Sequence, residues 1–196
     1  MRSISLLVVV GALLACGSAA APPRSVAPTA TANKPTPLIL EKLEGERRVW
    51  REIVGVPGSA DPSHFILKVD PRNGGSSHLV FGTEDLGPGD NIEEHRHPGA
   101  DEIVFLQNGT ARASVGGETR EVHGGATVFI PANTLISLNN TGKETIHLVF
   151  VFSAPGFEEF MRAESVREGE KNTPLTKAED AAIMKRHARA VVYTQP

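Results

Sequence analysis

From Leu38 onward the chain alternates short apolar runs with turn signals, and this alternation limits the possible fold more than any other feature of the sequence. Asn-Gly, Gly-Gly and Thr-Gly pairs separate many of the runs. The expected strands lie at residues 48–54, 64–69, 77–82, 101–109, 110–117, 118–125, 126–131, 135–142 and 144–152. Regularly spaced short strands predict an all-β sandwich or barrel. Gly116 and Gly117 predict a tight hairpin, since glycine takes the positive φ values of a primed turn.

The composition excludes several other classes of protein. The chain has 196 residues, 40% of them hydrophobic and 22% charged, which fits one folded domain with extensions. Its formal charge is −3 and it has no run of basic residues, so we expect no nucleic-acid partner. The chain has one cysteine, Cys16, which excludes an internal disulfide and a thiolate metal cluster.

The N-terminus has the pattern of an export signal. Arg2 precedes an apolar run from Ile4 to Ala15 that is too short to span a bilayer, so residues 1–15 are expected to be a signal peptide. The ending LLAC resembles the lipobox of bacterial lipoproteins, which implies that Cys16 is acylated and becomes the first mature residue. The alternative is an ordinary signal peptide, cut after SAA or AAA, that discards Cys16.

A tether is expected between this signal and the folded part. Residues 16–37 are rich in Ala, Pro, Thr and Ser and cannot form a core, so we expect a disordered linker. With a lipidated Cys16, the domain would be anchored to a membrane of the bacterial cell envelope, and Gly17 favours the outer membrane, facing the periplasm. The alternative is a soluble periplasmic or secreted protein.

The composition changes again after Phe152, where we expect a short helical extension at residues 154–196. The segment 155–169 is predicted to contain one short helix. Thr176 with Glu179 three residues later forms a capping-box signature, which predicts a helix at 177–188. The segment AVVY near the C-terminus is a candidate edge strand.

The segment EEHRHPGADE carries the candidate chemistry. His95 and His97 are two residues apart, so on a strand their imidazoles share one face. Glu102 would face away on an uninterrupted strand, but the Pro98-Gly99 turn lets the next strand return it to the same interior. Two histidines and one carboxylate form a facial triad that suits Fe, Mn, Zn or Ni and leaves coordination positions open.

The frame around these residues resembles the cupin superfamily. Gly89, His95, His97, Glu102 and Gly109 match every fixed position of the first cupin motif. Downstream, Gly125, Pro131 and Asn140 follow the second motif. The resemblance implies a single-domain cupin β-barrel (a double-stranded β-helix or jelly roll) at residues 38–153, similar to small bacterial quercetin-dioxygenase-like cupins, with the site at its mouth. Cupins often dimerise through barrel edges, and a homodimer stays open here.

The sequence departs from the second motif at two positions. Asn133 replaces a glycine, which is a mild change because asparagine tolerates left-handed backbone angles. Ile136 replaces the last metal-binding histidine, and neither His123 nor His147 is placed to substitute for it. Both outcomes remain open: three protein ligands hold the metal with waters, or the interior is free of metal.

The expected inner wall is apolar. Val104, Leu106, Ile136 and Leu138 should point inward, and the only tyrosine, Tyr193, is expected to lie away from the site in the tail. An apolar pocket with an open metal favours an oxygenase that acts on a small apolar or aromatic molecule. The alternatives are a non-catalytic module that captures a small ligand or a metal, and a barrel that serves only as a scaffold.

Overall fold

The computed structural model describes residues 34–56 and 63–194. The predicted signal peptide, Cys16 and most of the predicted tether lie outside these residues. Within them, no helix has the length and apolarity needed to cross a membrane.

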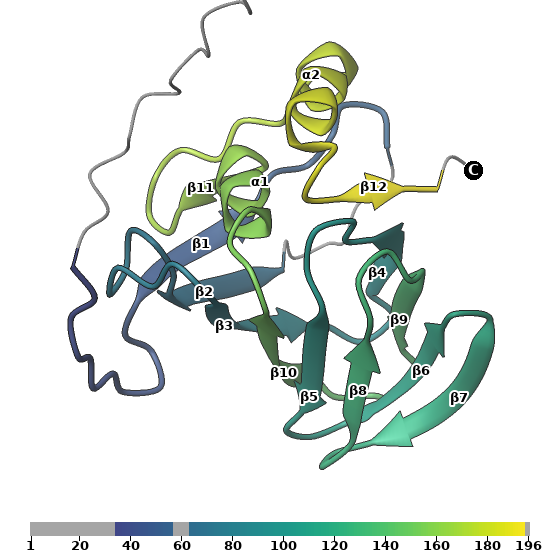
Figure 1. Cartoon of the computed structure of the whole chain (residues 1–196). Helices are drawn as coiled ribbons and strands as arrows, with labels where there is room; N and C mark the ends of the chain where they lie inside the picture. Colours follow the sequence, from purple (N-terminus) through teal and green to yellow (C-terminus); the bar gives the residue numbers. More distant parts are fainter. Residues whose placement is uncertain (1–33, 57–62, 195–196) are drawn as a thin grey trace, which may run out of the picture. The chain divides into compact units, whose positions relative to one another are not determined.

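Two antiparallel sheets make up the structure (Figure 1), and the fold is mostly β, as predicted. The larger sheet contains, in spatial order, β11 (Ser165–Arg167), β1 (Glu46–Trp50), β2 (His64–Val69), β3 (Val80–Leu86), β10 (Ile146–Phe152), β5 (Glu102–Leu106) and β8 (Thr127–Ile130). The smaller sheet contains β12 (Val192–Tyr193), β4 (Asn91–Arg96), β9 (Ile136–Asn140), β6 (Thr110–Val115) and β7 (Glu118–His123). Chain neighbours such as β4 and β5 therefore lie in different sheets.

The alternation of side chains places the core between the sheets. In β5, Glu102, Val104 and Leu106 are buried, whereas Ile103 and Phe105 are exposed on the other face. β10 alternates in the same way along its whole length. One apolar core results, because the period of two gives each strand an inner and an outer face.

The turns follow the glycines that the sequence singled out. Gly116 and Gly117 have φ values of 58° and 88° and join β6 to β7, which confirms the predicted hairpin. Asn133 is the one non-glycine residue with positive φ in the described part of the chain, at 64°. Asn133 therefore has the left-handed backbone conformation that asparagine, like glycine, tolerates.

Most predicted elements are present, with shifted bounds. The expected strand at 77–82 is displaced to β3, and β4 was not among the predicted strands. The segment 155–169 contains helix α1 (Phe157–Ala163) and also the unpredicted strand β11. Helix α2 (Lys177–His187) begins with the predicted capping box between Thr176 and Glu179. The expected edge strand is β12, which pairs with β4.

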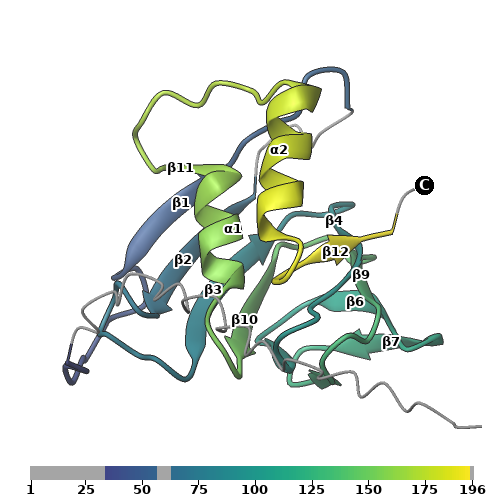
Figure 2. The ribbon, with the colours of Figure 1, turned by 45° about the horizontal axis from the view of Figure 1, so that its top comes forward.

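The C-terminal extension lies over one end of the strands, with α1 and α2 side by side (Figures 1 and 2). A buried arginine joins α1 to the larger sheet. The Arg162 guanidinium contacts the carboxylates of Asp70 at 2.6 Å and Glu46 at 2.7 Å. Phe160 and Met161 add apolar contact from the same helix. The extension is thus part of the folded domain and brings its residues close to β4.

Candidate metal centre

The local chain path brings His95, His97 and Glu102 together. His95 lies near the end of β4, and the strand ends before His97. The Pro98-Gly99 turn follows, and Glu102 begins β5 in the other sheet. The backbone N–H of Asn133 donates to the carbonyl of His97 at 2.8 Å, which holds the chain after it leaves β4. The turn therefore delivers the carboxylate to the histidines, as the sequence predicted.

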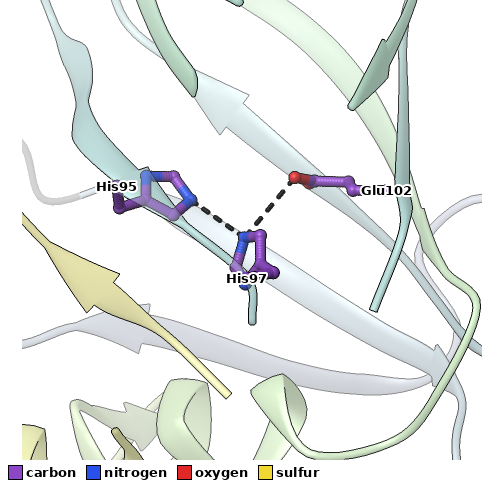
Figure 3. A group of neighbouring side chains, drawn as sticks. All are labelled: His95, His97 and Glu102. Atoms are coloured by element: carbon purple, nitrogen blue, oxygen red, sulfur yellow. Dashed lines mark hydrogen bonds and ion pairs between the residues drawn. The ribbon is translucent and has the colours of Figure 1, made fainter. Parts of the chain in front are cut away.

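The three side chains converge on a common centre (Figure 3). The Nε2 atoms of His95 and His97 are 2.9 Å apart, and His97 Nε2 is 3.5 Å from Glu102 Oε2. One ligand atom from each residue lies within 4.8 Å of the others. The residues are only 4%, 2% and 7% exposed, respectively. The group has the spacing and composition of a cluster that could hold one metal ion.

Backbone carbonyls fix the orientation of both imidazoles. His95 Nδ1 lies 2.7 Å from the carbonyl of Glu93, and His97 Nδ1 lies 2.9 Å from the carbonyl of Ala190. A carbonyl only accepts, so each Nδ1 must carry the proton and donate it. In the neutral imidazoles both Nε2 lone pairs then point into the centre. Metal-ligating histidines are commonly oriented in the same way, by a carbonyl that accepts a hydrogen bond from the ring nitrogen that does not bind the metal.

Burial keeps the histidines neutral. It lowers the pKa of His97 to about 3, helped by the neighbouring His95 and opposed by the hydrogen bond to Ala190. Burial also lowers the pKa of His95, against the effect of its bond to Glu93. Two neutral Nε2 acceptors at 2.9 Å repel each other unless a cation or proton lies between them. The donor set therefore fits a divalent ion.

The pKa of the Glu102 carboxyl group is also shifted. Burial, and after it the negative charge of Glu84, raise the pKa of Glu102 from its ordinary value to about 8. An ionised carboxylate in this interior is costly without a positive partner. A metal ion would supply that partner for Glu102 and for the two imidazoles at once.

The other histidines lie elsewhere. Ile136, at the position of the missing ligand, is the register partner of His95 between β4 and β9, and it is buried. His123 is exposed and lies 3.2 Å from the Thr110 hydroxyl. His147 Nδ1 lies 2.6 Å from Asp85 Oδ1, away from the cluster. Within the described residues, the cluster thus offers three candidate protein ligands.

The expected wall residues are all part of the core. Val104, Leu106, Ile136 and Leu138 are each at most 4% exposed and pack in one apolar cluster. A groove of about 520 Å³ lies on a different face, lined by residues such as Phe81, Thr83, Asp85 and His147. That groove does not include any of the three candidate ligands.

Aromatic side chains that sequence reasoning missed surround the histidines. The ring centroid of Phe157 is 4.4 Å from that of His97, and Phe152 is 4.8 Å from the same ring. Tyr193 is 5.2 Å from His95, so the expectation that it lies away from the site was wrong. The edge strand carries it there, because β12 pairs Tyr193 with His95. The AVVY sequence predicted an edge strand, but it did not predict which residues of the neighbouring strand it would pair with.

Comparison with known proteins points to one family. Residues 82–152 match the family described as Cupin domain. The chain is 26% identical over 115 residues to the tetracenomycin polyketide synthase protein TcmJ of Streptomyces glaucescens, covering 56% of this chain and 77% of that protein. It is 29% identical over 83 residues to the polyketide synthase CurC of Streptomyces cyaneus, covering 42% of this chain and 54% of that protein. The chain thus spans only about half the length of CurC.

A solved structure has the same fold. The crystal structure of a predicted oxalate decarboxylase from Thermotoga maritima matches with a TM-score of 0.52, covering 60% of this chain and all of that chain at 18% identity. At this identity the likeness concerns the fold alone. The segment 82–152 that matches the family contains His95, His97 and Glu102. Residues 82–152 of this chain therefore resemble the Cupin domain family in sequence, and the structure has a fold of the same kind.

Proposed function

We propose that His95, His97 and Glu102 hold a single divalent ion (Fe, Mn, Zn or Ni) and that the domain is an oxygenase for a small apolar or aromatic molecule. The proposal rests mainly on the two Nε2 atoms, which are 2.9 Å apart. Because the Nδ1 atom of each ring donates its proton to a backbone carbonyl, both Nε2 lone pairs are free to bind an ion. A bound ion would polarise a ligand in its open coordination positions and, if redox-active, exchange electrons with it.

The chain's own residues would position that ligand. The carbonyls of Glu93 and Ala190 keep both imidazoles in the ligating tautomer. Phe157 and Phe152 present ring edges and faces beside His97, and they favour contact with an apolar or aromatic surface. The relatives TcmJ and CurC are named for polyketide synthases, so polyketide-type compounds are the substrates to test first.

Metal content tests the proposal directly. The purified chain, prepared without chelator or added metal, should contain one equivalent of a divalent ion by elemental analysis. His95→Ala and His97→Ala should each lose it. His147→Ala is the matched control, because this histidine is paired with Asp85 outside the cluster. A parent protein that takes up no divalent ion even when it is supplied would rule the proposal out.

A second candidate is a non-catalytic module that captures a small ligand or the metal itself. The buried Ile136 beside His95 favours it, because the missing fourth ligand leaves the ion less firmly held. Dioxygen consumption separates the two candidates. A metal-loaded protein that binds aromatic compounds but consumes no dioxygen with any of them would support capture over catalysis.

We also propose that the domain is tethered to a bacterial membrane through a lipid on Cys16. The LLAC sequence supports this proposal, and the linker that follows it would hold the domain off the surface. Incorporation of labelled palmitate into the wild type, and its loss in Cys16→Ser, would be the expected result. Release of an unlabelled, soluble wild-type protein would instead support the ordinary signal peptide.

A further inference from the structure

The segment that precedes β1 exposes a run of large apolar side chains. Leu38, Ile39, Leu40 and Leu43 are 43%, 97%, 36% and 58% exposed, respectively. Every residue from 34 to 45 is exposed. Single exposed apolar residues are common on proteins, but a group of them close together marks an interaction surface. We call residues 38–43 the apolar loop, and the candidate metal centre uses none of them.

Hydrogen bonds to the larger sheet hold this loop in place. The Thr36 N–H donates to the carbonyl of Gly74 at 2.9 Å. Further along, the Glu44 N–H donates to the carbonyl of Glu41 at 3.1 Å and closes a turn. The buried Lys68 ammonium group donates to the carbonyls of the same two residues, both at 2.8 Å. The apolar side chains are therefore presented by an ordered turn, so contact with a partner costs little ordering entropy.

The loop borders the groove on the outer face of the larger sheet. Leu40 and Leu43 line this groove together with the half-buried side chains of Ile66, Phe81 and Val149. These three residues come from β2, β3 and β10, which are neighbours in the sheet. The exposed leucines therefore continue an apolar surface that begins on the sheet.

The charges of the loop segment balance, so no net charge selects a charged partner. Lys34 and Lys42 offset Glu41 and Glu44. A polyanion or a strongly charged peptide gains little from such a surface. An apolar partner gains more, because the contact removes several large apolar side chains from water.

The place of the loop in the sequence points to a lipid bilayer as that partner. Leu38 lies 22 residues after Cys16, the proposed lipidation site. A flexible linker of this length has an end-to-end distance of about 25 Å. A lipid on Cys16 would keep the loop near the bilayer at all times, so even a weak contact with lipid would be well populated.

We propose that the apolar loop inserts into the interfacial layer of the lipid bilayer, with Ile39 and Leu43 at the boundary between headgroups and acyl chains. This inference rests on the proposed tethering and deepens it. The linker alone would let the domain stand off the surface, whereas the loop would bring one end of the domain into contact and fix its orientation. The segment 34–45 (dark purple) and α2 lie at opposite ends of the domain in Figures 1 and 2, so α2 would face away from the membrane.

A polarity-sensitive dye on Ile39→Cys tests the contact. In the mature chain this cysteine is the only free thiol by either route of processing, because Cys16 would carry lipid on its sulfur or be removed with the signal peptide. Vesicles of phosphatidylcholine should shift the emission of the dye to the blue, and brominated lipid should quench it.

Val54→Cys with the same dye is the matched control. Val54 is 56% exposed, close to the value for Leu43, and its N–H donates to the carbonyl of Leu175 just before α2. A dye at this position should be neither shifted nor quenched. No quenching at residue 39, or equal quenching at both positions, overturns the inference.

Leu43→Ser tests the second inserted side chain. Combined with the dye at residue 39, it should raise the lipid concentration needed for half-maximal quenching about threefold or more. Val54→Ser should leave that concentration unchanged. Salt at about 0.5 M should also leave it unchanged, because the contact is apolar. Quenching that is lost in salt, or that Leu43→Ser and Val54→Ser affect equally, refutes an apolar contact through this loop.

The same protein separates this inference from the proposed lipid anchor. Palmitate-labelled protein whose dye at residue 39 is not quenched would be anchored through Cys16 alone, which refutes the loop contact. Unlabelled protein whose dye is quenched by added vesicles would support the loop contact and refute the anchor. Protein with neither label nor quenching would refute both.

Discussion

Ile136 is the register partner of His95 across the β4–β9 pair, so it occupies the place from which a fourth protein ligand would reach the centre. Ile136→His should therefore increase metal affinity, by about tenfold or more. Competition with a chelator of known affinity measures the change. Ile136→Asn is the control, since it introduces a polar group without an imidazole. A folded Ile136→His protein with unchanged affinity would show that the position does not face the ion.

Through Glu102, metal-free protein should lose stability as the pH rises from the unfolded pKa of this group, 4.5, to its folded pKa of about 8. The pKa of Glu102 is raised to about 8 from an ordinary value of 4.5, so the folded state holds this proton more tightly than the unfolded state. The resulting stability is fully present below the unfolded pKa and is lost as the pH rises through about 8. The lowered pKa of His97 makes stability rise with pH instead. That rise ends at the ordinary histidine pKa of 6.5, so it does not affect the comparison at higher pH.

The measurement compares free energies of unfolding at about pH 6.5 and 8.5. The loss should approach a limit of about 1.4 kcal/mol per pH unit from this one group. Glu102→Gln should reduce the slope without abolishing it, because Glu84 and Glu164 also have raised pKa values of about 7. Saturating metal should reduce the wild-type slope too, by stabilising the ionised carboxylate. Equal slopes in wild type and Glu102→Gln would exclude Glu102 as the source.

Sequence reasoning located the three residues of the candidate cluster because they are close along the chain. Period-two alternation put His95 and His97 on one face, and the Pro98-Gly99 turn brought back Glu102. The carbonyl of Ala190 and the ring of Tyr193 could not be found in this way, because they come from the C-terminal segment, far along the chain. The pairing of β12 with β4 is a tertiary contact, and the short AVVY segment does not specify its register.

The buried ion pairs of Arg162 should dominate the attachment of α1. The carboxylates of Asp70 and Glu46 both contact the Arg162 guanidinium, at 2.6 Å and 2.7 Å. Arg162→Ala removes this shared positive partner from both of them. Removing one member of a buried pair typically costs about 3–5 kcal/mol, and urea unfolding would measure it. Arg120→Ala removes an exposed pair with Glu118 and should cost less than about 1 kcal/mol. Similar losses in both variants would contradict this interpretation.

The C-terminal strand should tune the metal centre although it supplies no ligand. Deletion of residues 189–196 removes the Ala190 carbonyl that orients His97 and the Tyr193 ring that packs on His95. Loss of such outer contacts lowers metal affinity by about 10–100-fold, and chelator competition would detect it. Circular dichroism should show that the β structure persists. Tyr193→Phe keeps the ring and the strand, so it should bind metal like the wild type. An affinity that survives the deletion unchanged would mean that the β4 and β5 strands alone hold the imidazoles in place.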